Sequence, residues 1–292
     1  MKVAAIGEAM IELLTEGVTA RIGVAGDTLN TAIYLKRSAP ELHVDYVTRL
    51  GRDDFSRHIV AFIAEQGLGI DAIERDPDRT CGLYAVTTDD AGERTFTYWR
   101  GQSAARQLFS GPRGVSFDWL GGYDLIYLSG ISLAILPQAT RDGLLEWLAQ
   151  YRAAGGRVVY DSNYRPALWS DHTIAQQVTR RMWHMCDIAL PSLDDEVALF
   201  EESAEDVAAR FLAMGKTGAL KRGAAGPLCL ETGQSGTYDP APKVIDTTAA
   251  GDSFNGAYLA ARLLGQSQDA ALQSGHALAA RVVGHRGAII PA

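Results

Sequence analysis

One stretch near the C-terminal end combines small residues with a single acid at the start of a predicted helix. Because residues 257–264 are strong helix formers, we expect this helix to begin near Ala250 or Gly251. The first backbone N–H groups of a helix have no partner within it, so those from Ala249 to Gly251 can bind a phosphate. Asp252 falls in the first turn, where its carboxylate can accept a proton from a hydroxyl that attacks this phosphate. The spacing predicts a phosphoryl-transfer site without a P-loop.

The same residues allow a simpler interpretation. An acid in the first turn stabilises the helix dipole, and the polar triplet Asp246-Thr247-Thr248 can serve as a cap. Neither role requires a ligand. The spacing alone is compatible with both interpretations.

A second polar cluster lies near the N-terminus, where glycines precede a predicted helix over residues 31–37. Asp27 or Thr28 is expected to cap this helix, because short polar side chains accept hydrogen bonds from the first N–H groups. Gly26 permits a close backbone approach. Asn30 either contacts a ligand or satisfies the local backbone, and the pattern is compatible with both.

A third cluster follows a predicted apolar strand that ends at Asp161. Asn163 and Arg165 come directly after it, and alternation of side chains would place all three on one side. Open α/β sheets bind ligands at the carboxyl ends of their strands, so this triplet favours a binding site. A salt bridge within the loop, between Asp161 and Arg165, is the structural alternative.

Two alternating segments, 82–88 and 95–100, flank the turn residues 89–93 and predict a β-hairpin. Together with the extended residues 9–25, the hairpin would form a small second sheet. Tyr84 alternates to one face of its strand, and Tyr98 and Arg100 to one face of the returning strand, which suggests contact with a ligand. A dimer contact or a covered sheet surface is the alternative, because tyrosines are common in both.

The rest of the chain alternates predicted strands and helices, which is typical of a mostly parallel sheet covered by helices on both faces. At 292 residues, the chain is expected to form one domain over residues 1–292, with a lid at about 9–25 and 80–100. The prediction is therefore an α/β fold with a small β-sheet lid.

Composition narrows the function classes. A net charge of −8 argues against nucleic acid as a partner, because phosphate backbones require basic surface. The pattern contains neither a membrane span nor a signal-peptide cleavage site, which predicts a cytoplasmic protein. Cys81, Cys186 and Cys229 are odd in number and widely spaced, so we expect free thiols rather than disulfides or a zinc site.

The motifs together resemble the PfkB, or ribokinase-like, family of carbohydrate kinases. Residues 246–252 resemble its DTxGAGD signature, with Ala249 in place of the first glycine, and residues 26–32 resemble its first signature. The resemblance covers essentially the whole chain in the same order. It implies a three-layer α/β/α core, with ATP and Mg²⁺ as cofactors.

The resemblance also implies a role for individual residues. Asp252, with the N–H groups of Ala249, Ala250 and Gly251, would be catalytic. The residues that would bind the substrate are Gly26, Asp27, Asn30, Tyr84, Tyr98, Arg100, Asn163, Arg165 and Asp252. Those that would bind the nucleotide are Ser192, Lys221, Gly223, Gly226, Ala250 and Gly251. Mg²⁺ would be held through water by Asp195 and Glu196, although Ser192-x-x-Asp195 departs from the family's N-x-x-E pattern.

Within the family, residues 26–30, 98–100 and 161–169 look most like kinases of the sugar acid 2-keto-3-deoxygluconate. Arg100 and Arg165 suit such a substrate, because guanidinium groups bind carboxylates through two donors. We therefore expect phosphorylation of the terminal hydroxyl of a sugar acid, giving 2-keto-3-deoxy-6-phosphogluconate, by a homo-oligomer that associates through its lid.

Other functions remain as alternatives. A fructokinase or another sugar kinase of the family would need the arginines less, and a non-catalytic sugar-acid sensor could share the fold. A P-loop NTPase is disfavoured because Arg210 occupies the first glycine position before Gly215-Lys216-Thr217. Neither an esterase elbow nor a dinucleotide fingerprint fits the sequence.

Overall fold

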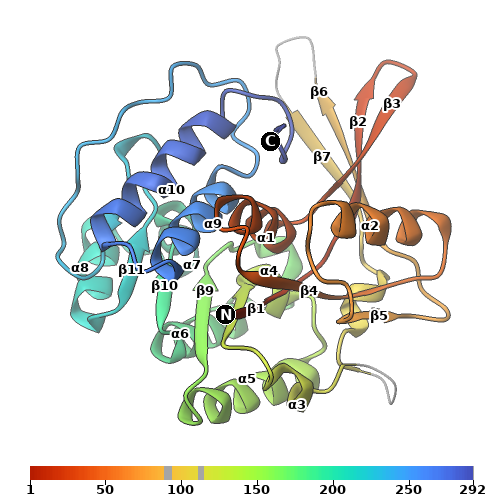
Figure 1. Cartoon of the computed structure of the whole chain (residues 1–292), viewed down its shortest axis with the longest axis horizontal. Coiled ribbons are helices and arrows are strands. Elements are labelled where there is room, and N and C mark those ends of the chain that lie inside the picture. Colours follow the sequence, from red (N-terminus) through yellow and green to blue (C-terminus); the bar gives the residue numbers. More distant parts are fainter. Residues whose placement is uncertain (89–93, 111–114, 292) are drawn as a thin grey trace.

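The computed structural model describes residues 1–88, 94–110 and 115–291 (Figure 1). Its main sheet has eight strands in the order β12-β11-β10-β9-β8-β1-β4-β5, and all neighbours are parallel except β11 and β12. The strands of this sheet are β1 (Lys2–Ile6), β4 (His43–Leu50), β5 (Ile73–Arg75), β8 (Leu125–Ser129), β9 (Arg157–Asp161), β10 (Ile188–Leu190), β11 (Thr217–Leu220) and β12 (Leu228–Cys229). This arrangement confirms the predicted, mostly parallel sheet.

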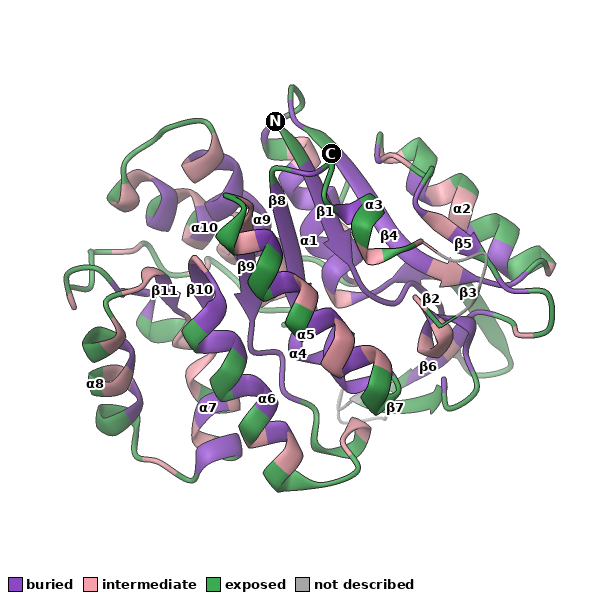
Figure 2. Cartoon of the chain, turned by 90° about the horizontal axis from the view of Figure 1, so that it is seen from below, coloured by how far each residue is buried: buried purple, intermediate pink, exposed green. Residues whose placement is uncertain are grey.

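Helices cover both faces of the sheet, because strand side chains alternate between two hydrophobic clusters. In β1, for example, Val3 and Ala5 join one cluster and Ala4 and Ile6 the other. The first cluster is covered by α1 (Asp27–Ser38), α2 (Asp54–Glu65), α9 (Ala250–Leu263) and α10 (Gln268–Val282). The second is covered by α3 (Phe117–Leu120), α4 (Gly130–Ala134), α5 (Gln138–Ala153), α6 (His172–Met185), α7 (Leu193–Phe200) and α8 (Ala204–Met214). Figure 2 shows these buried strands between helices with exposed outer faces.

The described residues also contain three short 3₁₀ helices: η1 (Ala104–Gln107), η2 (Pro166–Leu168) and η3 (Gly223–Ala225). None of the helices in the described residues is long and apolar enough to cross a bilayer.

The predicted second sheet is also confirmed. Its strands are β2 (Met10–Glu16), β3 (Thr19–Ala25), β6 (Gly82–Thr88) and β7 (Arg94–Trp99), in the order β3-β2-β6-β7. The pairs β2–β3 and β6–β7 are antiparallel, whereas β2 and β6 are parallel. The predicted turn at 89–93 lies outside the described residues. The sheet extends to one side of the main body (Figure 1).

Close packing of α9 against α1 brings two distant segments together. A Cβ added to Gly256 of α9 would lie 2.6 Å from Cβ of Tyr34 and 2.8 Å from the backbone N of Leu35. Only glycine therefore permits this approach. As a result, Asn30 at the start of α1 lies beside Asp252 at the start of α9.

The first helix differs from its prediction. Helix α1 begins at Asp27 rather than near residue 31, and its N-cap is Gly26, which offers no side chain for capping. Neither Asp27 nor Thr28 is the cap. The Asp27 carboxylate instead accepts hydrogen bonds from Ser129, the last residue of β8, and from Asn163, which follows β9, so tertiary contacts replace the local cap.

Candidate functional site

The start of α9 has the geometry of an anion site. The helix begins at Ala250, as predicted, and Ala249 precedes it in the left-handed conformation with φ of 60°. This conformation favours glycine, so alanine here carries backbone strain. The N–H of Ala250 donates to the carbonyl of Thr247 at 3.2 Å, whereas that of Gly251 has no acceptor among the described residues. The open donor and the helix dipole attract negative charge.

Asp252 lies within this first turn and has the properties of a base. Its Oδ2 accepts a hydrogen bond from Nδ2 of Asn30 at 2.8 Å. Burial and the nearby negative charges of Asp27 and Asp161 raise the pKa of Asp252 to about 8, while Asn30 and Lys221 oppose this shift. A carboxylate with a pKa near neutrality is a stronger proton acceptor than an ordinary one, so the site can activate a hydroxyl.

Asp27 supplies a second, partly buried carboxylate to the site. Its Oδ2 accepts hydrogen bonds from Oγ of Ser129 and, at 2.8 Å, from Nδ2 of Asn163. Burial is the main cause that raises the pKa of Asp27. Asn163 adopts a φ of 29°, an uncommon backbone conformation that is often retained near functional sites. These contacts fix the orientation of Asp27.

Gly26 is required by a close approach of two backbone segments. A Cβ at this position would lie 2.2 Å from the carbonyl oxygen of Glu8. Packing between the β1–β2 connection and the start of α1 therefore requires glycine here. This contact places Asp27 and Asn30 at the end of the sheet.

The predicted nucleotide residues gather at the ends of β10 and β11. Ser192 forms an isolated parallel bridge with Lys221. Gly223 begins η3 and Gly226 follows it, with φ of 54° and 73°. The Lys221 ammonium donates to Oδ1 of Asp161 at 2.7 Å. A Cβ added to Gly251 would lie 3.7 Å from this Nζ, so the lysine stands beside the start of α9.

The predicted ligand residues of the small sheet differ in exposure and in their partners within the protein. The Tyr84 hydroxyl donates to Oε1 of Glu12 at 2.6 Å, and its ring lies 5.6 Å from that of Tyr98, which is half exposed. Arg100 is buried and forms an ion pair with Glu8. Two of its nitrogens are thereby engaged within the protein.

Asp161, Asn163 and Arg165 have different partners. Asp161 contacts Lys221 and Asn163 contacts Asp27, whereas Nη1 of Arg165 lies 3.3 Å from Oδ1 of Asp195. The reason is that the strand ends at Asp161, after which the backbone no longer alternates. Arg165 remains 54% exposed at its side chain, so it is available to a ligand.

The two acids predicted to hold Mg²⁺ diverge. Oδ2 of Asp195 accepts from Oγ of Ser162 at 2.9 Å, at the end of β9. Glu196 has no exposed surface, and its oxygens accept from Trp183 at 3.1 Å and from Arg210 at 3.0 Å. Glu196 therefore faces away from the site, which removes it from the metal prediction. Within the described residues, no group of three His, Cys, Asp or Glu side chains could hold an ion.

Sequence reasoning missed Asn255 and Tyr127. Asn255 is fully buried and donates to Oδ2 of Asp161 at 3.0 Å and to the Tyr127 hydroxyl at 3.2 Å. A local signal did exist, because residues three apart on a helix share a face and Asn255 lies three after Asp252. For Tyr127, within an apolar strand, no such signal is present.

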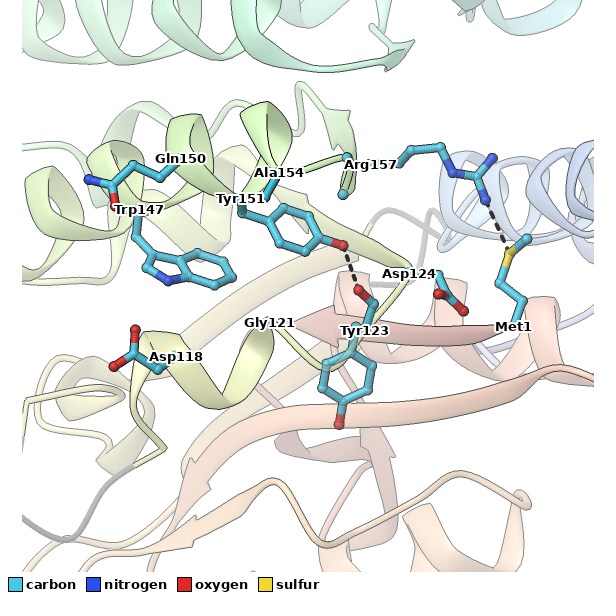
Figure 3. Close-up of a pocket in the computed structure, with 12 residues that line it drawn as sticks. Met1, Asp118, Gly121, Tyr123, Asp124, Trp147, Gln150, Tyr151, Ala154 and Arg157 are labelled. Atoms are coloured by element: carbon cyan, nitrogen blue, oxygen red, sulfur yellow. Dashed lines mark hydrogen bonds between the residues drawn. The ribbon is translucent and has the colours of Figure 1, made fainter.

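A cavity of about 760 Å³ lies elsewhere, between α3, α5 and the starts of the central strands (Figure 3). Met1, Asp124 and Arg157 line it at the amino ends of β1, β8 and β9. Asp252 and its partners lie at the opposite, carboxyl ends, and none of the predicted site residues lines this cavity. Ligands of open α/β sheets bind at carboxyl ends, so we assign the site to the start of α9.

The covered parallel sheet, the small second sheet and the anion site beside an acid together define a ribokinase-like protein. The pfkB carbohydrate kinase family matches residues 2–292. The chain belongs to this family of carbohydrate kinases.

Individual relatives agree with this assignment. The chain is 44% identical to 2-dehydro-3-deoxygluconokinase of Escherichia coli K12, over 99% of this chain and 97% of the relative. It is 27% identical to a fructokinase of Vibrio alginolyticus, over 87% of this chain and 81% of the relative. Its fold matches that of a putative ribokinase II from E. coli in complex with ATP and Mg²⁺, with a TM-score of 0.84, 24% identity and coverage of 98% and 94%. The predicted kinase activity is thereby confirmed.

Proposed function

We propose that the protein transfers the γ-phosphoryl group of ATP to the terminal hydroxyl of 2-keto-3-deoxygluconate. This sugar acid is the 2-dehydro-3-deoxygluconate in the name of the E. coli relative. One observation carries the proposal: the Asp252 carboxylate lies beside the open N–H of Gly251 at the start of α9. A proton acceptor and an anion site are what attack of a hydroxyl on a phosphate requires.

In the proposed reaction, Asp252 takes the proton of the sugar hydroxyl as its oxygen attacks phosphorus. A new P–O bond forms, the bond to the β-phosphate oxygen breaks, and ADP leaves. The N–H groups at the start of α9 and the Lys221 ammonium stabilise the transferring charge. Asn30 holds Oδ2 of Asp252 at 2.8 Å, which leaves the other oxygen for the substrate.

The nucleotide would lie along the ends of β10 and β11, against Ser192, Lys221, Gly223 and Gly226. Gly251 and Ala250 would meet its terminal phosphates. Mg²⁺, when bound, would neutralise phosphate charge, and Asp195 is the acid in position to hold it through water. Asp195 is mostly buried, and burial is the main cause that raises its pKa, an effect that a cation would reverse.

The sugar acid would lie between the main sheet and the small sheet. Gly26, Asp27, Asn30 and Asn163 would meet it from the core, and Tyr84 and Tyr98 from the small sheet. Arg165 is the better candidate for its carboxylate, because it pairs with Asp195 through one nitrogen and its side chain is 54% exposed, whereas Arg100 is buried and donates through two nitrogens to Glu8. Free guanidinium donors favour a sugar acid over fructose.

We also propose that the small sheet closes as a lid and joins two subunits. Its apolar side chains Ile22 and Trp99 are 50% and 59% exposed, which would suit a contact between copies. Closure would exclude water, which otherwise competes as phosphoryl acceptor. The three cysteines are free and buried, in keeping with our proposal of a cytoplasmic enzyme.

A substrate panel tests the proposed function. ADP release is measured with ATP and Mg²⁺ and, in turn, 2-keto-3-deoxygluconate, its galactonate epimer, gluconate and fructose. We expect the highest kcat/KM with 2-keto-3-deoxygluconate. A preference for fructose would instead make the protein a fructokinase. Binding of the sugar acid by calorimetry without ADP release would indicate the sensor.

A further inference from the structure

A closed set of buried hydrogen bonds lies behind the start of α9. The Lys221 ammonium donates to Oδ1 of Asp161 at 2.7 Å and to Oδ1 of Asn255 at 3.2 Å. The Asn255 amide donates in turn to Oδ2 of Asp161 at 3.0 Å. These three side chains, which we call the lysine triangle, come from β9, α9 and the residue after β11. Each corner contacts both others.

The lysine triangle is anchored from behind. Asp161 is 2% exposed and Asn255 is fully buried. The Tyr127 hydroxyl accepts from Asn255 at 3.2 Å and lies 3.1 Å from Oγ1 of Thr31. Thr31 donates to the main-chain carbonyl of Asp252 at 3.2 Å. The hydrogen bonds therefore run continuously from Lys221 to the backbone of the proposed base.

Lys221 is placed where a transferring phosphoryl group would meet it. Its side chain is 12% exposed, and its Nζ lies 3.7 Å from the position of a Cβ on Gly251. A lysine side chain has four flexible bonds, so an ammonium without fixed partners would sample many positions. Preorganised charges stabilise a transition state better than mobile ones, because they need no rearrangement during the reaction.

We propose that Asp161 and Asn255 are positioning residues that hold the Lys221 ammonium against the start of α9 for phosphoryl transfer. The inference rests on the proposed function and adds to it two residues that do not touch the reacting atoms. A purely stabilising role is a weaker explanation, because a buried ion pair rarely stabilises a fold better than apolar side chains do.

Substitutions can also separate the effects that neighbouring charges have on the pKa of Asp252. The groups that shift the pKa of Asp252 most are Asp27 and Asn30 from α1, Asp161 from β9 and Lys221 after β11. Three tyrosines also lie close enough to feel the charge of Asp252: Tyr34 of α1, Tyr84 of β6 and Tyr127 of β8. Asp161 raises the pKa of Asp252 and Lys221 lowers it. Asp161→Asn should therefore move the acidic limb of kcat/KM to lower pH, and Lys221→Met should move it to higher pH. A loss of structure would not produce opposite shifts.

A double-mutant cycle tests the positioning role. We expect Lys221→Met to lower kcat about a hundredfold, as loss of one charge-stabilising donor does, and Asp161→Asn to lower it about tenfold. If Asp161 acts through Lys221, the double variant loses no more than Lys221→Met alone. Lys216→Met is the matched control, because Lys216 also donates to two acceptors, the carbonyls of His184 and Cys186, but lies at the opposite end of β11 from Lys221. Its kcat should remain unchanged.

Each contrary result has a distinct meaning. Losses that multiply in the double variant, or pH limbs that move in the same direction, would overturn the positioning role. A wild type without ADP release would contradict the proposed function instead. Should Asp161→Asn fail to fold, Asn255→Ala takes its place in the same cycle, because it removes the other partner of Lys221. Thermal melting of every variant shows which of them fold.

Discussion

Two carboxylates of this protein, Asp252 and Glu196, have raised pKa values but opposite surroundings. Burial raises the pKa of Asp252 to about 8 and that of Glu196 to about 7. Around Asp252, further negative charges add to the effect and an open N–H lies nearby. Around Glu196, Arg210 and Trp183 occupy both oxygens and oppose the effect. Both acids lie in the first turn of a helix at the carboxyl end of the sheet.

The difference shows that a raised pKa does not by itself mark a reactive group. Glu196 is satisfied by its neighbours and has no exposed surface, so its environment is that of a structural ion pair. Only Oδ2 of Asp252 has a hydrogen-bond partner among the described residues, and the like charges of Asp27 and Asp161 lie nearby. This arrangement lowers the stability of the folded protein. Such a cost is retained where it serves a reaction.

The largest expected difference between the two acids is the effect of their replacement on kcat. We expect Asp252→Asn to lower kcat about a thousandfold, since a general base contributes on this scale. Glu196→Gln should change kcat less than about twofold, because it lacks access to the substrate. ADP release under saturating substrates measures both. Near-normal turnover of Asp252→Asn would remove Asp252 from the role of base.

The pH dependence of kcat/KM should report Asp252 and be independent of Glu196. With a pKa of about 8, the free enzyme is mostly protonated at Asp252 at pH 6 and active once it ionises. We therefore expect kcat/KM to rise about ninetyfold between pH 6 and pH 9. The profile of Glu196→Gln should follow that of the wild type. A profile that is flat over this range would contradict the raised pKa of the base.

Arg165, which pairs with Asp195, and Arg210, which pairs with Glu196, allow a smaller contrast. Arg165→Leu should raise KM for the sugar acid about tenfold, because one charged hydrogen-bonding partner of a carboxylate is lost. KM for ATP should change little. Arg210→Leu, which removes the partner of Glu196 and Glu202, should lower the melting temperature and leave both KM values unchanged. Equal effects of Arg165→Leu on both substrates would indicate structural damage instead.

Asp252→Asn and Glu196→Gln should change the melting temperature of the protein in the same direction. Asp252 in the unfolded chain ionises near its ordinary pKa of 3.8, whereas the folded protein holds the proton up to about pH 8. The folded state therefore loses stability as pH rises through this window. Asparagine does not ionise, so Asp252→Asn should melt about 2 to 5 °C above the wild type at pH 8 and close to it at pH 4. A lower melting temperature at pH 8 would contradict the raised pKa.

For Glu196→Gln, the same reasoning predicts a smaller gain, because the pKa of Glu196 is raised less. The two variants would then share the sign of their stability effect and differ in turnover. This combination would confirm that the raised pKa lowers stability at both acids but contributes to activity only at Asp252.

Much of the fold was predictable because its signals are local. The start of α9 at Ala250 follows from a run of helix formers after small residues, and α5 at residues 138–153 follows from apolar periodicity. The start of α1 was wrong by four residues, because Asp27 is satisfied by Ser129 and Asn163 rather than by a local cap. No pattern within the helix could show this.

Within the site, helix spacing accounts for Asp252 beside the N–H groups, since these residues are adjacent in the chain. The divergence of Asp161, Asn163 and Arg165 was not predictable, because it depends on where the strand ends. Nor was the inward orientation of Glu196, which differs from that of Asp195 by one position on α7. Successive side chains on a helix point in directions about 100° apart, so one acid can face the site while its neighbour faces the core.

The amino-acid sequence by itself determined the succession of strands and helices and the acid at the start of α9, since neighbouring residues decide periodicity and capping. Tertiary structure alone decided which distant side chains meet. Asn30 and Asp252 are 222 positions apart, and Lys221 and Asp161 are 60 apart. Their contacts depend on sheet order and on the close packing of α1 against α9, which no local preference encodes.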